Sequence, residues 1–419
     1  MPEDLHVPVA IVGGGQAGLA MSHCLSEGDI GHVVLERDRL GHDWRERRWD
    51  SFCLVTPNWQ CDLPGFPYRG ADPHGFMARD EITDYLVGYA RSFDPPLHEG
   101  VEVTRLAQSD GGDFELETSD GTLRADQVVV ATGGYHHPLV PPLAAGLPGD
   151  VEQVHSCAYR SPQALPEGSV LVVGTGQSGC QIAEDLHLAG RLVHLSVGRA
   201  PRTARFYRGR DVTDWLHDMG HYDLPVTEHA LGDGIRLQAN HYVTGRDGGH
   251  DIDLRQFALE GMRLHGHLHR VDRDGLGFAD DLGANLDHAD EVAKGIKDAV
   301  DAFIAKRGIR GAPTEPRYEP PWRPPPGGSG LDLADEPIGS VVWSTGYRSD
   351  YRWIDVAAFD GTGYPVHHRG VSGVAGLYFL GLPWLHTWGS GRFAGVARDA
   401  RHLADRIGAA ASAGLVRAA

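Results

Sequence analysis

Two glycine triplets with identical spacing are the residues of this chain best suited to chemistry. They are Gly13, Gly15 and Gly18 in the first copy and Gly174, Gly176 and Gly179 in the second, each directly after an apolar run. In such a fingerprint the glycines allow a tight turn, close approach of backbone to a pyrophosphate, and close packing of a helix on a strand. The N–H groups at the start of that helix then face the phosphate charge. Two copies predict two bound dinucleotides.

A carboxylate stands where it can select the first dinucleotide. Glu36 ends the apolar run 33–35, eighteen residues after Gly18. An acid at the end of this second strand can accept a hydrogen bond from an adenosine ribose hydroxyl. A glycine turn that only packs is the alternative, and it accounts for neither the strand nor the acid. The first copy therefore predicts an FAD site.

The second copy lacks that acid. Its second strand is expected over 192–195, and Ser196, Arg199 and Arg202 follow it. A hydroxyl and guanidinium groups can bind a 2′-phosphate, which a carboxylate would repel. The second copy therefore predicts NADPH. Further arginines follow closely, so a solvated surface stretch and an NADH site stay open as alternatives.

Each fingerprint is followed by the same order of elements, which indicates a duplicated fold. The meander runs are 101–103 and 114–117 with a turn at 120–121 in the first half, and 263–271 and 276–278 with a turn at 274–275 in the second. The closing strands end at Ala131-Thr132-Gly133 and at Ser344-Thr345-Gly346. The pattern predicts an α/β fold with two Rossmann-like dinucleotide-binding domains, the second inserted in the first, each with a β-meander.

We assign residues 1–150 and 336–419 to the FAD-binding domain and 151–335 to the NADPH-binding domain. Insertions are expected at about 203–258 and 281–335, and long loops of this kind are usually lids or binding surfaces. The other expected elements are a helix N-capped by Asp287, an extended proline–glycine linker over 313–330 and a C-terminal helix from about 392 to 407.

Composition narrows the class of partner. The 419-residue chain has a net charge of −19, which argues against nucleic acid or an anionic membrane. No apolar stretch reaches membrane-spanning length and the first strand begins by Val7, so we expect a soluble cytoplasmic protein. The five cysteines form no Cys-x-x-Cys or Cys-x4-Cys pair, so disulfide reductase chemistry is not expected. The alternating histidines of 265–269 lack a nearby acid or cysteine, so no metal site is predicted.

Further motifs resemble those of class B flavin-dependent monooxygenases, the family of FMO-type, YUCCA-type and Baeyer–Villiger enzymes. Besides the fingerprints and the two Thr-Gly strand ends, residues 41–50 and 63–67 are similar to the family's flavin-contacting stretch. Residues 50–59 and 381–388 are similar to a bacterial branch encoded beside nitrilases.

His155 and Tyr159 resemble the family's interdomain signature. Leu147 replaces the phenylalanine of that signature, and His155 lies two residues farther from Gly149 than the family spacing. We interpret this as a loop insertion that keeps His155 at the domain junction. Baeyer–Villiger members usually carry tryptophan at the position of Tyr159, which disfavours ketone-to-ester chemistry.

The resemblance implies that NADPH reduces FAD, that O2 adds at flavin C4a, and that the resulting (hydro)peroxide oxygenates a small molecule, with nitrogen or sulfur as the expected target. The protein then has to orient the cofactor and exclude water. An NADPH-dependent flavin oxidase or reductase and Baeyer–Villiger oxygenation are alternatives, and a flavin-binding redox sensor is the non-enzymatic one. The expected partners are the substrate and O2; a homodimer is left open.

The fingerprints and the resemblance together assign residues to sites. FAD is expected at Gly13, Gly15, Gln16, Ala17, Gly18, Glu36, Arg37, Trp44, Arg45, Val103, Ala131, Thr132, Gly133 and Arg392. NADPH is expected at Gly174, Gly176, Gln177, Ser178, Gly179, Ser196, Arg199, Arg202, Thr345 and Gly346. Asn58 is the catalytic candidate, and Trp59, His386 and Trp388 are the substrate-pocket candidates.

Overall fold

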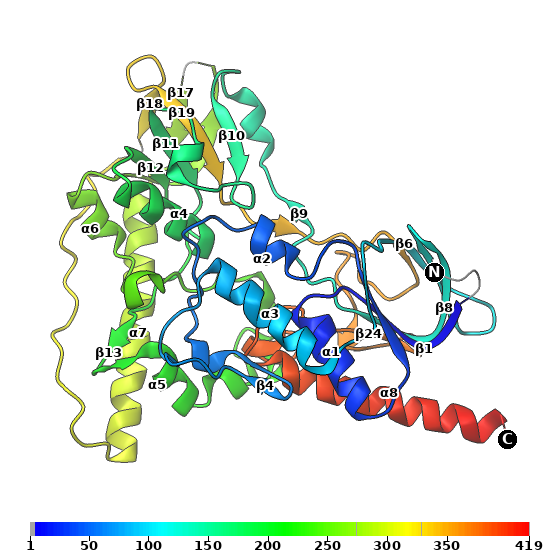
Figure 1. Ribbon diagram of the computed structural model, residues 1–419. Coiled ribbons are helices and arrows are strands. Elements are labelled where there is room, and N and C mark those ends of the chain that lie inside the picture. The colour runs from blue at the N-terminus through cyan, green and yellow to red at the C-terminus, as the bar shows by residue number, and fades with distance from the viewer. Residues whose placement is uncertain (1–4, 274, 328, 419) are drawn as a thin grey trace.

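The chain folds into two lobes, each built on its own β-sheet (Figure 1). The computed structural model describes residues 5–273, 275–327 and 329–418. The larger sheet has ten strands and the smaller has five, which confirms the predicted α/β class with two Rossmann-like halves. No described helix combines the length and the hydropathy that crossing a lipid bilayer requires.

Three parallel strands form the centre of the larger sheet. They are β1 (Leu5–Val12), β2 (His32–Glu36) and β8 (Gly121–Val130). Val12 is aligned with Leu35 on one side and with Val130 on the other, so the carboxyl ends of the three strands meet at one edge. In open α/β sheets this is the edge at which ligands bind.

The first predicted β-meander is present in the same sheet. It consists of β6 (Val103–Gln108), β7 (Phe114–Thr118) and β8, joined antiparallel. Other strands of the sheet are β5 (Leu97–Glu99), β21 (Ile354–Asp355), β22 (His367–His368), β23 (Val371–Ser372) and β24 (Leu377–Phe379). Because strands from both ends of the chain share this sheet, the smaller lobe is an insertion between them.

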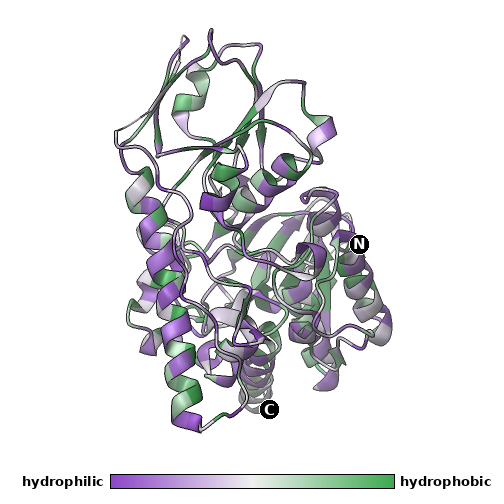
Figure 2. Ribbon diagram, turned by 90° about the vertical axis from the view of Figure 1, so that its left-hand side faces the viewer, coloured by the Kyte–Doolittle hydropathy of each residue, from purple (hydrophilic) through white to green (hydrophobic). Residues whose placement is uncertain are grey.

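Helices pack against one face of the larger sheet and bury its apolar side chains. They are α1 (Gln16–Glu27), α2 (His42–Glu46), α3 (Arg79–Phe93) and α8 (Val396–Ala418). The strands are mostly hydrophobic, whereas the helices alternate hydrophobic and hydrophilic residues, as amphipathic helices do (Figure 2). A 3-10 turn over Trp388–Gly391 precedes α8, so this helix starts four residues later than expected.

The smaller sheet is parallel throughout. Its strands are β10 (Glu152–His155), β11 (Ser169–Val173), β12 (Val193–Ser196), β15 (Arg263–His265) and β19 (Ile338–Trp343), in the order β10-β19-β11-β12-β15. Helix α4 (Gln177–Leu188) follows β11 as α1 follows β1. The second fingerprint therefore lies at the carboxyl edge of this sheet.

Three details of the second half differ from the sequence expectation. Strand β19 pairs with β10 and β11, so the junction between the lobes falls after about residue 346 rather than at 335. The run 263–271 is split, because β15 joins the parallel sheet and only β16 (Leu268–Val271) joins the meander. The meander is completed by β17 (Gly275–Phe278) and by β18 (Gly330–Asp332), which begins at the last residue of the expected linker. The turn residue Asp274 lies outside the described residues.

The inserted segments connect the two lobes. The segment from about 203 to 259 contains α5 (Val212–Asp218), α6 (Leu254–Leu259) and short 3-10 turns, one of them over His221–Asp223. Helix α7 (Leu282–Arg307) starts before Asp287, which lies inside the helix and pairs with Arg255 rather than capping it. After α7, residues 309–327 run back alongside that helix (Figure 1).

Candidate cofactor and substrate sites

The first glycine loop leaves an open cradle at the edge of the larger sheet. Gly13 has φ of +107°, and a Cβ on it would lie 2.7 Å from the carbonyl oxygen of Ala131. A Cβ on Gly18 would lie 1.8 Å from the Gly13 carbonyl oxygen, so only glycine lets α1 approach β1 this closely. At Gly15, no atom lies within 4 Å of the Cβ position. The fold requires the two outer glycines, and the middle one faces space of the kind a pyrophosphate needs.

The second loop repeats this geometry at the smaller sheet. Gly174 has φ of +103°, and its Cβ position lies 2.7 Å from the carbonyl oxygen of Ser344. The Cβ position of Gly179 lies 1.9 Å from the Gly174 carbonyl oxygen, and that of Gly176 has no atom within 4 Å. Ser344 thus stands where Ala131 stands in the first half. Two loops with the same turn, the same close packing and the same open position fit two dinucleotides.

Glu36 lies at the end of β2, beside the first loop. Its Oε2 accepts a hydrogen bond from the Gly14 N–H at 2.6 Å, and its Oε1 accepts one from the Asp38 N–H at 2.9 Å. These contacts fix the carboxylate at the rim of the cradle, and each oxygen keeps a lone pair for a ribose hydroxyl. The neighbouring Arg37 donates from Nε to Asp38 at 3.0 Å at the surface.

Thr132 lies beside the first cradle and has a buried hydroxyl. It follows β8 with Ala131 and Gly133, next to the turn at Gly13. Its hydroxyl is buried and has no hydrogen-bond partner within the described part of the chain. A buried hydroxyl without a partner costs free energy, so its position at the cradle fits a site that a bound cofactor completes.

The other predicted FAD residues surround this edge at different depths. Gln16 begins α1 after the loop, with Ala17 buried behind it, and its Nε2 donates to the Gly391 carbonyl at 3.4 Å. Trp44 packs between Phe52 and Phe393, at centroid distances of 6.0 and 5.8 Å. Arg45 is exposed, and Val103 is half-buried at the start of β6.

The three residues predicted for the 2′-phosphate differ in their burial and in their hydrogen-bond partners. Buried Ser196 donates its hydroxyl to the Gly266 carbonyl and accepts from the Leu268 N–H, both at 3.0 Å. Buried Arg202 donates from Nε to Asp290 at 2.7 Å. Both groups are committed to packing the smaller lobe, which corrects the expectation for them. Arg199 is exposed one residue after Gly198, whose N–H donates to Thr175 of the glycine loop.

Further NADPH candidates form hydrogen bonds between the second glycine loop, the end of β19 and neighbouring segments. Gln177 begins α4, followed by Ser178, and its Nε2 donates to the Val243 carbonyl at 2.5 Å, which ties the glycine loop to the inserted segment. The Thr345 hydroxyl donates to the Leu139 carbonyl. Gly346 offers its carbonyl oxygen to His155 at 2.9 Å.

Asn58 has a structural role. It is buried, its Nδ2 donates to the Asp72 carbonyl at 3.0 Å, and its Oδ1 accepts from the Met77 N–H at 2.7 Å. Both ends of the amide therefore fix the loop 72–77. The hydrogen bonds that the structure gives Asn58 are made with this backbone, so the side chain fixes the loop, and its catalytic role stays a prediction.

His155 and Tyr159 lie at the junction of the lobes. The His155 ring packs edge-on against Tyr347 at 5.0 Å, and burial lowers its pKa. The Tyr159 hydroxyl donates to Asp185 Oδ2 at 2.7 Å. The other oxygen of Asp185 accepts from Ser51 of the larger lobe at 2.7 Å and from Arg246 of the insertion at 2.8 Å. One buried carboxylate thus joins three parts of the chain.

The substrate-pocket candidates lie in two groups. Trp59 donates from Nε1 to Asp214 at 3.0 Å and packs edge-on against His217. Trp388 packs on Tyr222 at 4.4 Å, and the Arg392 guanidinium lies 3.9 Å from the Trp388 ring centroid. His386 contributes its carbonyl to the Val226 N–H at 2.7 Å, which fixes the insertion against the C-terminal segment.

Sequence reasoning missed Tyr222 and Asn240, which contact this second group from the inserted segment. Nothing in their local sequence marks them, since the segment has no regular period. They contact Trp388 and Arg392 because the C-terminal segment folds back to the first glycine loop, where Gln16 donates to the Gly391 carbonyl.

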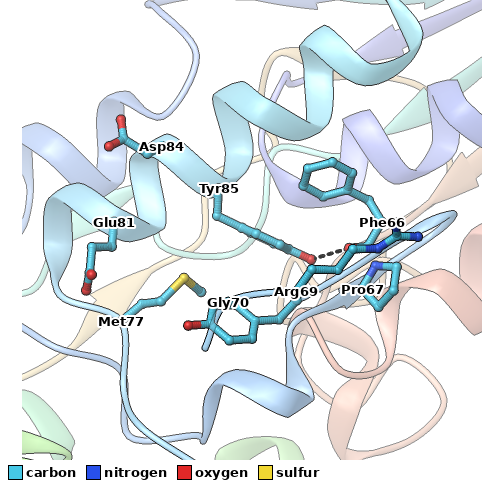
Figure 3. A pocket seen from close by; sticks show the side chains of 9 residues that line it. Phe66, Pro67, Arg69, Gly70, Met77, Glu81, Asp84 and Tyr85 are labelled. Carbon is cyan, nitrogen blue, oxygen red and sulfur yellow. Dashed lines mark hydrogen bonds between the residues drawn. The ribbon is translucent and has the colours of Figure 1, made fainter. Parts of the chain in front are cut away.

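Two surface cavities lie away from the glycine loops. One, of about 320 Å³, lies between α3 and the loop 66–70. Figure 3 shows Tyr85 of α3 reaching to Phe66, with Glu81 and Asp84 on the helix above it. The other, of about 410 Å³, lies between residues 50–53, 72–78 and 245–248. Neither contains a fingerprint residue, so neither is assigned to a cofactor.

All five cysteines are free thiols. Cys24, Cys53, Cys61 and Cys180 are buried, and burial raises the pKa of each, so they are protonated and unreactive at neutral pH. Cys157 is half-buried, with its sulfur 3.3 Å from His155 Nδ1. This arrangement agrees with the expectation that the chain lacks a redox-active dithiol.

Comparisons with known proteins decide the family. Residues 10–233 match the family model described as pyridine nucleotide-disulphide oxidoreductase. The chain belongs to this family. It is 34% identical over 408 residues to an uncharacterized CzcO-like oxidoreductase of Geobacillus kaustophilus, covering 96% of this chain and 98% of that one.

The monooxygenase resemblance is confirmed as well. The chain is 33% identical over 200 residues to a probable indole-3-pyruvate monooxygenase, YUCCA4 of Arabidopsis thaliana, which covers 47% of this chain and 48% of that one. Its fold is that of a flavin-containing monooxygenase from Stenotrophomonas maltophilia, with a TM-score of 0.67, 19% identity, and coverage of 97% and 99% of the two chains. The protein is an oxidoreductase with the fold of a two-dinucleotide flavoenzyme.

Proposed function

We propose that the protein is an FAD- and NADPH-dependent monooxygenase that transfers one oxygen atom of O2 to a nitrogen or sulfur atom of a small molecule. The observation that carries the proposal is the repeated open glycine cradle, once at the edge of each sheet. Bound FAD would accept a hydride from NADPH and pass the electrons to O2. The balance is one NADPH, one proton and one O2 consumed, with one oxygen atom in the product and the other in water.

The chain's own residues have to bind, orient and exclude water. In the first cradle, Gly15 leaves room for the pyrophosphate and Glu36 receives the ribose. In the second, Gly176 leaves room, and the exposed Arg199 would bind the 2′-phosphate. The buried contacts of His155 and of Asp185 hold the two cradles in register and close the junction to water.

The choice of nitrogen or sulfur rests on Tyr159. It occupies the signature position at which Baeyer–Villiger members carry tryptophan, and its hydroxyl is fully engaged with Asp185. The absence of a free dithiol among the described cysteines supports O2 over a disulfide as the electron acceptor.

The test is the fate of heavy oxygen. FAD-loaded protein is supplied with NADPH, ¹⁸O2 and a panel of amines and thioethers, and NADPH loss, hydrogen peroxide and labelled product are measured together. One labelled oxygen atom per product molecule supports the proposal. Hydrogen peroxide equal to the NADPH consumed, with no labelled product across the panel, would replace it with an oxidase.

The junction supplies a matched comparison. In His155→Ala the contact to the Gly346 carbonyl is lost, so we expect a larger share of the NADPH to end as hydrogen peroxide while FAD remains bound. The control is His269→Ala, which removes an exposed histidine from the same lobe. Equal peroxide shares in the two variants would contradict a sealing role for His155.

A further inference from the structure

Arg392, which is half-buried, differs in its partners from the arginines that lie in the protein interior. Arg202, Arg205 and Arg255 are almost fully buried, and each pairs with an aspartate at 2.9 Å or less. Arg392 instead donates from Nη1 to the Trp388 carbonyl at 2.5 Å and from Nη2 to Asn240 Oδ1 at 2.8 Å. In the part of the chain that the structure describes, no carboxylate forms an ion pair with it.

A half-buried cation without an anion beside it loses part of its hydration and gains no ion pair in return. Burial lowers the pKa of Arg392, which is the sign of a charge removed from water without compensation. A guanidinium has five N–H donors, and the two contacts use only two of them. The three that remain suit the two oxygens of a carboxylate, which arginine binds in a bidentate fork.

The position of Arg392 places it next to the first cradle. The preceding residue, Gly391, accepts a hydrogen bond from Gln16, the first residue of the helix after the glycine loop. The Arg392 side chain contacts Trp388 and Asn240 rather than that loop. It therefore lies between the predicted flavin position and the inserted segment, where a substrate would approach.

The surroundings of Arg392 are aromatic and uncharged. The Trp388 ring lies under the guanidinium and Tyr222 packs on Trp388. Tyr222 also packs on His221, and burial lowers the pKa of both His221 and the nearby His241, the latter to about 4, so these histidines are neutral at pH 7. Arg392 therefore supplies a positive charge beside the rings of Trp388 and Tyr222.

We propose that Arg392 binds the carboxylate of the substrate while the rings of Trp388 and Tyr222 contact its apolar body, so that the enzyme acts on small organic acids. This rests on the proposed function and adds its substrate class. It differs from the expectation that Arg392 binds FAD, because the side-chain hydrogen bonds of Arg392 go to Trp388 and Asn240 rather than to the first glycine loop.

Binding to the oxidised, FAD-loaded protein tests this without turnover. Phenylacetate and hexanoate are titrated calorimetrically against their uncharged amides, phenylacetamide and hexanamide, with the flavin difference spectrum as a second readout. We expect the wild type to bind at least one acid about 10-fold or more tighter than its amide. Arg392→Gln should weaken acid binding about 10- to 100-fold and leave amide binding unchanged, since a hydrogen bond to a charged group contributes about 1.5–3 kcal/mol.

Two controls separate the alternatives. Arg401→Gln removes the same charge from an exposed position of the following helix, α8, and should leave acid binding unchanged. Arg392→Lys should retain part of the acid affinity, because it keeps the charge but not the fork.

Each remaining outcome overturns the proposal. If the wild type binds no acid, or binds acid and amide equally, Arg392 is no carboxylate site. If Arg392→Gln instead lowers the molar ratio of FAD to protein and leaves acid affinity unchanged in the loaded fraction, Arg392 belongs to the flavin site. Failure of the oxygen-transfer proposal would appear in the ¹⁸O2 experiment and leave these binding data as they stand.

Discussion

The contrast between Gly15 and Gly18 gives the sharpest test of the first cradle. Gly15 has φ of −70° and ψ of −171°, a conformation open to any residue, and its Cβ position meets no atom within 4 Å. Valine there should change the free energy of unfolding by no more than about 1 kcal/mol, the cost of a poorer helix N-cap. It would nevertheless fill the space that a pyrophosphate needs, so we expect purified Gly15→Val to carry less than about one tenth of the wild-type FAD.

The neighbouring glycine should behave in the opposite way. A Cβ on Gly18 would lie 1.8 Å from the Gly13 carbonyl oxygen, far inside van der Waals contact. Gly18→Ala should therefore destabilise the fold itself by about 1–3 kcal/mol or more, as overpacked cores do. Urea denaturation of the apoprotein gives the stability, and flavin absorbance per protein gives the occupancy.

The equivalent substitution in the second half completes the design. Gly176→Val should retain FAD and lose reduction by NADPH, because Gly176 has the same open Cβ position at the other sheet. If Gly15→Val keeps a full complement of FAD, or if Gly176→Val loses FAD and Gly15→Val does not, the assignment of the two cradles is wrong.

Two further predictions concern coenzyme choice and acid stability. Arg199→Gln should reduce the preference for NADPH over NADH about 10-fold or more, measured as rates of anaerobic flavin reduction. Arg202→Gln should instead lower the stability of the fold, because Arg202 pairs with Asp290. An unchanged preference in Arg199→Gln would refute the role of Arg199. Burial lowers the pKa of His194 to about 3 and of His265 to about 4, and their rings stack with Nδ1 of His194 3.0 Å from Nε2 of His265. In the unfolded chain both histidines bind protons below about pH 6.5, whereas in the folded chain they do not. The free energy of unfolding is therefore highest above pH 6.5 and falls as the pH falls towards 4. The slope is up to about 1.4 kcal/mol per pH unit for each histidine. Urea unfolding at pH 7.5 and 5.5 should show a smaller loss in His194→Leu than in the wild type, and equal losses would refute this origin.

The cofactor cradles could be predicted from sequence because each depends on local spacing. The three glycines of a copy lie within six residues, and each has a separate steric reason that any Rossmann-like loop imposes. Glu36 was predictable for the same reason, since the strand before it fixes its distance from the loop. The meander order was also correct, although its third strand, β18, directly after the predicted linker, was not predicted.

The errors arise where chemistry was inferred from residue type without its partners. Ser196 and Arg202 have the right groups for a phosphate, but Gly266, Leu268 and Asp290 come from distant parts of the chain and engage them first. Asn58 likewise has partners that its residue type does not reveal, because the backbone of the loop 72–77 makes a hydrogen bond to each end of its amide.

The substrate pocket shows why such sites resist sequence reasoning more than cofactor sites do. A dinucleotide is bound mainly by backbone at a turn, so its site is conserved in spacing and repeats when the fold is duplicated. The group around Arg392 is built from side chains of residues 222, 240, 388 and 392, which share no element and no repeat. Its geometry depends on the insertion in the smaller lobe reaching the C-terminal segment of the larger one. A change in the part of that insertion around Tyr222 can therefore alter the substrate without changing the glycines of either cradle, which is how one cofactor frame can serve different small molecules.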